Sequence, residues 1–131
     1  METREMEKIQ AKEKWQFYAD VWSMDEGRYL ALEKCVVPKV TYRDPSSKCQ
    51  GIEHFSNYMK GFQASLPGAN FEIKDAFVHH NRTLAHWSLV LADGSTLHDG
   101  TSFALMDDQG RFIEITGFFD LSKTEQNEDR K

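Results

Sequence analysis

The apolar residues of this 131-residue chain change their spacing once, near residue 69, and that change limits the folds open to the chain. Before it they recur every three or four positions, as in amphipathic helices; after it they alternate, as in strands with one buried face. Helices gathered ahead of strands are typical of α+β domains. We therefore expect a half-barrel in which three N-terminal helices pack on a curved, mixed and mostly antiparallel sheet.

Three helices are expected before residue 69, at about 5–23, 23–36 and 51–66. The second would begin at an N-cap supplied by Ser23 or Asp25 and end before Pro38, because proline cannot continue a helix. Helical spacing turns three sets of residues toward the core. They are Ile9, Ala11, Trp15, Tyr18, Ala19 and Trp22; then Tyr29, Leu32, Cys35 and Val36; and then Ile52, Phe55, Met59 and Phe62.

The remaining segments are expected to form strands. A short strand lies within "VPKVTYRDPSS", residues 37–47, and "SSKCQG" after it is expected to be a loop. Four long strands are predicted at about 70–80, 83–92, 95–106 and 111–121. Asp93-Gly94 is the strongest hairpin signal in the chain. A two-residue turn there would pair Ala92 with Ser95, Leu89 with His98, and Trp87 with Gly100.

Continuing this register divides the strand residues between two faces of the sheet. The first face holds Ala85, Trp87, Leu89, His98, Gly100, Ser102, Ala104, Ile115, Gly117 and Phe119. The second holds Phe77, His86, Val90, Leu97, Asp99, Thr101, Phe103, Phe112, Glu114, Thr116, Phe118 and Asp120. Because both carry large apolar groups, we expect helices on the first face and a second copy of the chain on the second, convex face. Small residues on the first face leave room for a cavity.

Composition narrows the class of protein. The length suits one domain over 1–131, with an ordered core at 8–121 and a polar tail at 122–131. A net charge of −5 argues against a nucleic-acid partner, and no apolar run approaches the roughly 20 residues of a membrane span. The charged N-terminus lacks the apolar segment of a signal peptide, so a cytoplasmic location is expected. The two cysteines, Cys35 and Cys49, are expected to be free thiols.

Asp44 is the acidic residue that raises the clearest question about function. Period-2 geometry puts it on the same strand face as Val40 and Tyr42, directly before Pro45. One interpretation is an Asx turn, which needs no function. The other is a carboxylate aimed into an apolar interior, where it would suit abstraction of a proton next to a carbonyl group. The residues themselves leave both interpretations open.

The histidines raise a similar choice. His98 is expected to be either a hydrogen-bonded interior residue or a polar group of a pocket. His79 and His80 are adjacent strand residues whose side chains should point to opposite faces, so they should not share a metal ion. His54 and His86 are scattered along the chain. The sequence therefore predicts no metal site.

The order of elements, with "RDP" after the short strand, resembles the nuclear-transport-factor-2-like, or SnoaL-like, superfamily. The resemblance covers about residues 8–121 and rests on "GIEHFSNYMKGF", "PGANFEI" and "HDGTSFALMDDQGRFIEITGFFD". Members include ketosteroid isomerase, polyketide cyclases and non-catalytic binding modules. They share a conical pocket lined by the concave sheet face and the helices, and they commonly dimerise. The resemblance thus implies a cone-shaped half-barrel with a pocket.

The resemblance also implies site residues. Asp44 occupies the position of the general base of ketosteroid isomerase, and Tyr18 is the nearest match to its oxyanion tyrosine. Ser102 stands where that enzyme has a protonated acid. In "HDG", His98 and Gly100 match the "H-x-G" of the cyclases. The implied catalytic residues are Asp44, Tyr18 and His98, and the implied substrate-binding residues are Trp22, Tyr42, Trp87, Ser102 and Phe119.

The function expected from this site is acid–base chemistry on a small hydrophobic carbonyl compound, as an isomerase, cyclase or lyase. No cofactor is expected, because proton transfer requires none. The alternative is a non-catalytic ligand-binding module or dimeric scaffold of the same fold, because fold does not determine function. An open cavity with Asp44 at its floor would favour the enzyme, and a closed cone filled by side chains would favour the scaffold.

Overall fold

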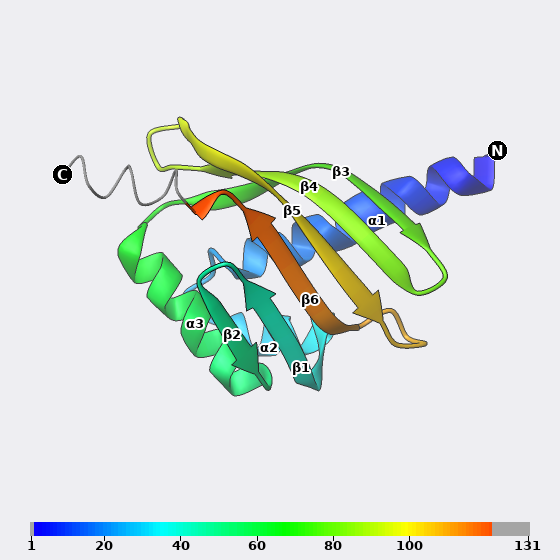
Figure 1. The fold of residues 1–131 in the computed structure, drawn as a ribbon, viewed down its shortest axis with the longest axis horizontal. Helices are drawn as coiled ribbons and strands as arrows, with labels where there is room; N and C mark the ends of the chain where they lie inside the picture. Colours follow the sequence, from blue (N-terminus) through cyan, green and yellow to red (C-terminus); the bar gives the residue numbers. More distant parts are fainter. Residues whose placement is uncertain (1, 122–131) are drawn as a thin grey trace.

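The structure is a computed structural model that describes residues 2–121, so the predicted polar tail at 122–131 lies outside the described residues. The described residues form three helices and six strands, and Figure 1 shows how they are arranged. The helices are α1 (Glu2–Val21), α2 (Arg28–Cys35) and α3 (Ile52–Ser65). The strands are β1 (Val36–Asp44), β2 (Ser47–Gln50), β3 (Asn70–His79), β4 (Arg82–Val90), β5 (Thr96–Met106) and β6 (Phe112–Phe119).

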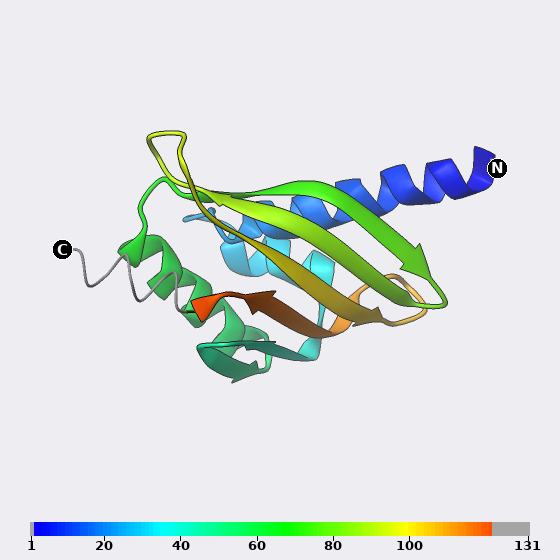
Figure 2. The ribbon, with the colours of Figure 1, turned by 45° about the horizontal axis from the view of Figure 1, so that its top comes forward.

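The six strands form one curved, open sheet in the order β2-β1-β6-β5-β4-β3. Only β1 and β6 pair in parallel, and the other neighbours are antiparallel. The helices lie on one side of this sheet, as the two views in Figures 1 and 2 show. The predicted α+β architecture, with three N-terminal helices on a mixed and mostly antiparallel sheet, is therefore confirmed.

The buried face of α1 matches the prediction from residue 11 onward, but Ile9 is 58% exposed. The predicted start of α2 is wrong. Its N-cap is Gly27 in a left-handed conformation, and Ser23 instead donates a hydrogen bond to the carbonyl oxygen of Ala69. Because this eight-residue helix begins late, its buried residues are Arg28, Ala31 and Leu32. Tyr29 is 44% exposed, which corrects its predicted core position.

Strand β2 was expected to be a loop. Its residues pair antiparallel with β1, with Cys49 opposite Tyr42 and Ser47 opposite Asp44. Only Cys49 of the four is buried, because β2 is an edge strand that turns its polar residues to the outside. The polar composition of the segment therefore hid a strand that the hairpin with β1 creates.

The β4–β5 hairpin has the predicted register but not the predicted turn. Trp87 pairs with Gly100 and Leu89 with His98, as expected. The connection, however, is longer than two residues, because the Leu91 N–H donates to the Ser95 carbonyl oxygen. The extra residue is compensated by a bulge on β5, where the register shifts between Leu89 and Val90. Leu97 in that bulge lines the cavity described below, which corrects its predicted place on the second face.

A second bulge changes the faces at the start of β6. The register shifts between Leu105, which pairs with Glu114, and Met106, which pairs with Phe112. The extra residue turns Phe112 into the core, where it is 1% exposed and packs on Trp15. Phe112 was predicted on the second face, because strict alternation does not allow for an inserted residue.

Helix α1 is held to the sheet edge by a polar contact as well as by packing. The Gln16 side chain donates to the carbonyl oxygen of Phe71 and accepts from the N–H of Ile73. It thus takes the place of a neighbouring strand along part of β3, the edge strand. This contact fixes the strand segment that carries Phe71 into the cavity wall. Within residues 2–121, no helix is long and apolar enough to cross a membrane.

Candidate functional site

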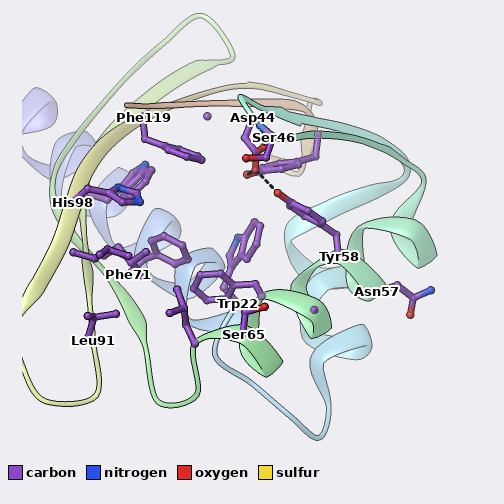
Figure 3. A pocket seen from close by; sticks show the side chains of 18 residues that line it. Trp22, Asp44, Ser46, Asn57, Tyr58, Ser65, Phe71, Leu91, His98 and Phe119 are labelled. Carbon is purple, nitrogen blue, oxygen red and sulfur yellow. Dashed lines mark hydrogen bonds between the residues drawn. The ribbon is translucent and has the colours of Figure 1, made fainter. Parts of the chain in front are cut away.

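A cavity of about 820 Å³ lies between α3 and the inner face of the sheet, a volume typical of small-molecule sites. Figure 3 shows the side chains that line it. Six of the eight residues predicted for the site are among them: Trp22, Tyr42, Asp44, Trp87, His98 and Phe119. The other two, Tyr18 and Ser102, line a separate cavity of about 40 Å³. Trp22, Tyr42, Phe71 and Trp87 line both cavities and so form the wall between them.

Asp44 lies at the end of β1, and both of its carboxylate oxygens are engaged. Oδ1 accepts hydrogen bonds from the backbone N–H groups of Ser46 and Ser47, at 2.8 and 2.9 Å. Oδ2 accepts hydrogen bonds from the hydroxyls of Tyr42 and Tyr58, each at 2.8 Å. The two interpretations that the sequence left open therefore hold together: one oxygen closes an Asx turn and the other belongs to the cavity wall.

The two tyrosines reach Asp44 from different elements. Tyr42 is buried on β1 and stacks on Phe55, with ring centroids 4.5 Å apart. Tyr58 is half-buried on α3. Burial raises the pKa of both hydroxyls well above the usual range, and the neighbouring Asp44 adds to the rise. Both tyrosines therefore remain protonated donors toward Asp44 at neutral pH.

Tyr58 was not among the residues predicted for the site, although it lines the cavity. The predicted inward positions of its helix were 52, 55, 59 and 62, and residue 58 lies beside that stripe. A signal was nevertheless present, because Tyr58 precedes Phe62 by four residues and so shares its side of the helix. The contact with Asp44 depends on how α3 lies against β1, which helical periodicity does not report.

His98 lies in the cavity wall on β5 and is 8% exposed. Its ring stacks on Phe119, with centroids 5.0 Å apart, and also contacts Trp87. Its Nδ1 lies 3.4 Å from the carbonyl oxygen of Asp99. In Figure 3, His98 and Asp44 project from different walls of the cavity. His98 is therefore both an interior residue and a polar group of the pocket.

Tyr18 and Ser102 face the smaller cavity. Ser102 accepts a hydrogen bond from Trp87 Nε1 at 3.0 Å, and this bond orients the indole across Gly100. Tyr18 is packed between Trp15 and Phe112. Burial raises the pKa of its hydroxyl well above the usual value, and a hydrogen bond with Trp22 opposes part of that rise. The structure thus places both residues beneath the aromatic wall rather than on the main cavity.

Among the described residues, the other histidines and cysteines do not form a second metal or nucleophilic site. His79 and His80 have Nδ1 atoms 3.2 Å apart, because His80 lies in a turn with positive φ rather than on the strand. The prediction that alternation separates them is therefore wrong. In the described part of the chain, however, no three His, Cys, Asp or Glu side chains are grouped to hold a metal ion. Burial raises the pKa of Cys35 to about 11, so its thiol stays protonated at neutral pH.

Solved structures share this fold at low sequence identity. A "putative isomerase" of the SnoaL-like family from Agrobacterium tumefaciens is 23% identical, with a TM-score of 0.79 over 86% of this chain and 98% of that chain. A "putative SnoaL-like polyketide cyclase" from Jannaschia sp. CCS1 is 15% identical, with a TM-score of 0.73 over 91% of each chain. A de novo designed protein with a curved β-sheet is 13% identical, with a TM-score of 0.63 over 85% and 86%. These likenesses establish the fold alone.

Sequence comparison supplies the family. No curated protein matches the chain significantly. The model of the SnoaL-like domain matches residues 16–115, from the middle of α1 to the parallel pairing of β6 with β1, and so includes Asp44, Tyr58 and His98. Because this match covers most of the sequence and the predicted architecture is observed, the chain belongs to the SnoaL-like family.

Proposed function

We propose that the protein binds a small hydrophobic carbonyl compound and acts on it as a cofactor-independent isomerase, cyclase or lyase. The observation that carries the proposal is the Asp44 carboxylate in the wall of an 820 Å³ cavity otherwise lined largely by aromatic and aliphatic side chains. A carboxylate in such a place is suited to remove a proton from carbon. Structural neighbours described as an isomerase and a polyketide cyclase support the same class of chemistry.

In this proposal Asp44 Oδ2 is the general base. A proton moves from the carbon next to the carbonyl group to Oδ2, and the electron pair moves onto the carbonyl oxygen to give an enolate. Return of the proton to another carbon completes an isomerisation. Attack of the enolate carbon on a second carbonyl group forms a ring and an alkoxide, which takes the proton from Oδ2 to complete a cyclisation. Expulsion of a leaving group forms a carbon–carbon double bond, and the leaving group takes that proton to complete an elimination. Each route needs a hydrogen-bond donor near the developing oxyanion.

The hydrogen bonds of Asp44 restrict how this base can work. A carboxylate offers about four lone-pair positions, and all four accept hydrogen bonds here. One donor must therefore move before Oδ2 can take a proton. Tyr58 is the donor that can yield, because it is half-exposed, whereas Tyr42 is buried against Phe55. The Tyr58 hydroxyl would then be placed to donate to the substrate oxygen.

The other predicted site residues have supporting roles in this proposal. Trp22, Trp87 and Phe119 supply flat apolar walls for the substrate, and His98 supplies a second polar group on another wall. Tyr18 and Ser102 line the smaller cavity and so would not touch a substrate in the main cavity. Ser102 would act through Trp87, whose indole it orients.

A second candidate function is non-catalytic ligand binding. The observation that favours it is the same set of four hydrogen bonds, because a carboxylate with every lone pair engaged is stable as a structural group. In that case the cavity would hold a ligand without changing it, and Asp44 would only join β1, its turn and α3.

Turnover by the native protein separates the two functions, and turnover by Asp44→Asn tests whether Asp44 is the base. Asparagine preserves the shape of the residue and can keep the Asx turn, but it is not a base. After a screen of small enolisable ketones identifies a substrate, we expect this variant to lose roughly 10²–10⁴-fold in kcat. Asp107→Asn is the matched control, because Asp107 Oδ1 also accepts two backbone N–H bonds but lies outside the cavity. Wild-type turnover by Asp44→Asn, with normal ligand binding, would contradict the role of Asp44 as the base, whereas ligand binding by the native protein without any turnover would leave only the binding function.

A further inference from the structure

At the end of the cavity that holds Asp44, the hydrogen bonds all point toward the carboxylate. Tyr42 and Tyr58 both donate their hydroxyl protons to Asp44 Oδ2. The backbone N–H groups of Ser46 and Ser47 donate to Oδ1. An ionised carboxylate is acceptor-only, and a tyrosine hydroxyl has one proton to give. The protons of the Tyr42–Asp44–Tyr58 cluster are thus all directed inward, and the cluster offers oxygen lone pairs to a ligand.

We infer that this end of the cavity takes a ligand group that donates a hydrogen bond, such as a phenol, enol or alcohol O–H or an N–H, in preference to a bare acceptor such as a ketone or ether. The inference rests on the proposed function for the location of the site, and it narrows the class of substrate. A carbonyl compound that also carries a hydroxyl or N–H group satisfies both, because the donor group anchors it at this end of the cavity while the carbon next to the carbonyl group keeps the proton that Asp44 removes.

The preference follows from hydrogen-bond energetics. A ligand O–H that donates to Tyr58 extends a chain that ends on the Asp44 charge, and such chains polarise and strengthen one another. A ligand carbonyl oxygen would face the lone pairs of the same hydroxyls. At the two tyrosines it could be accommodated only if Tyr42 or Tyr58 turned its proton away from Asp44. That change would remove a charge-assisted hydrogen bond in a site partly shielded from water.

The surroundings keep this arrangement in place. Burial raises the pKa of both tyrosine hydroxyls, so neither loses its proton over the neutral range. Tyr42 is also fixed by stacking on Phe55 and by contact with Trp22. Figure 3 shows Leu91 at the other end of the cavity from Asp44. The ligand is therefore oriented with its donor at the Asp44 cluster and its apolar body along the aromatic walls toward Leu91 and Leu97.

Binding of three matched ligands tests the inference without requiring turnover. They are 4-propylphenol, 4-propylanisole and 4-propylacetophenone, which share one apolar body and differ in a donor, an ether or a ketone head. Calorimetry or ligand-observed NMR at pH 7 gives their dissociation constants. We expect the phenol to bind the native protein about 10-fold more tightly than the anisole or the ketone, the effect of one hydrogen bond to a charged cluster.

Asp44→Asn should remove the preference. The side-chain amide that this substitution introduces can donate toward the tyrosines, which are then able to turn their own protons to the cavity and receive an acceptor. We expect the 10-fold advantage of the phenol to fall to about 2-fold or less, and the ketone to gain relative to the anisole. Asp107→Asn should retain the native ratios, because Asp107 lies outside the cavity.

Equal affinities for the three ligands in the native protein, or a phenol preference that persists in Asp44→Asn, would overturn the inference. Either result leaves the proposed function standing, since that depends on the turnover of the native protein and of Asp44→Asn. If none of the three ligands binds, the cavity is not a site for small apolar molecules, and the proposed function and the inference both fail.

Discussion

The two faces of the sheet are built from the same strands but meet different surroundings. On the inner face, Trp87, Ser102 and Ile115 are each buried beneath the helices or beside the cavity. On the convex face, Phe77 and Phe118 are 46% and 59% exposed within the described structure. Both faces carry aromatic groups, so apolar content alone does not identify the functional one. The inner face differs because the helices close over part of it and leave the rest as a cavity.

Two glycines on the inner face add to the difference between the two faces. At Gly100 an added Cβ would overlap the six-membered ring of Trp87, so the indole fits there only because residue 100 has no side chain. At Gly117 a Cβ would lie in ordinary contact with the Tyr42 hydroxyl and the Cβ of Asp44. The inner face thus gains its shape partly from side chains it lacks, whereas the convex face carries side chains at the corresponding alternate positions.

The largest expected effect comes from filling the Gly100 position. Gly100→Val should displace the Trp87 ring and lower the free energy of unfolding by about 2–4 kcal/mol, because overpacking a closed site forces its neighbours out of place. Thr101→Val, one residue along on the convex face, should change it by about 0.5 kcal/mol or less. Urea denaturation gives both values. Equal losses in the two variants would show that the faces do not differ in packing.

The second prediction concerns what covers the convex face. We propose that a second copy of the chain packs on this face, around the exposed Phe77 and Phe118 and the half-buried Val90 and Phe103, because exposed apolar groups gathered on one face mark interfaces. Phe118→Glu should weaken dimerisation about 100-fold or more, measured by sedimentation. Leu30→Glu is the control, because Leu30 is also exposed but lies on α2. A native protein that is monomeric at micromolar concentration would contradict the proposal.

The third prediction isolates the hydrogen bonds of Asp44 on the inner side. Asp44→Ala leaves two tyrosine hydroxyls and two backbone N–H groups without their acceptor and should cost about 2 kcal/mol of stability. Asp44→Asn should cost less, because it keeps the Asx turn. Asp107→Ala, which removes a similar turn at the surface, should also cost less. Thermal denaturation of the three variants ranks them. Asp107→Ala also removes the contact of Asp107 Oδ2 with Arg111, so an Asp44→Ala loss no larger than that of Asp107→Ala would contradict the prediction.

The smallest effect is a dependence of stability on alkaline pH. Burial raises the pKa of Tyr42 above the value near 10 that it has when unfolded. The folded state then holds a proton that the unfolded chain releases, so this contribution is fully present below pH 10 and declines above it. Tyr42→Phe should remove about 1 kcal/mol of the decline between pH 10 and 11. Urea midpoints at pH 8, 10 and 11 measure it, and an identical decline in the variant would show that Tyr42 is not the source.

Short-range features of the chain were predictable. The change in apolar spacing predicted the helices and the long strands. The Asx turn was one of the two interpretations of Asp44 before Pro45, and it could be foreseen because the Oδ1 bonds reach only two and three residues along the chain. Helical spacing placed Trp15, Tyr18 and Trp22 in the core correctly. Each of these depends on residues a few positions apart.

Tertiary structure decided the rest of the site. The bulges at Leu97 and Ile113 each insert one residue and so move a side chain to the other face, which alternation alone does not foresee. The contact between Tyr58 and Asp44 requires α3 to lie against β1 and β2. The separation of Tyr18 from the main cavity requires four aromatic side chains to form a wall: Trp22, Tyr42, Phe71 and Trp87. Sequence by itself determined that three helices precede four long strands and that an acid ends β1, because local backbone preference and apolar spacing govern both. Only the packed structure decided what that acid touches, because hydrogen bonds and cavities form between groups that the chain brings together from different elements.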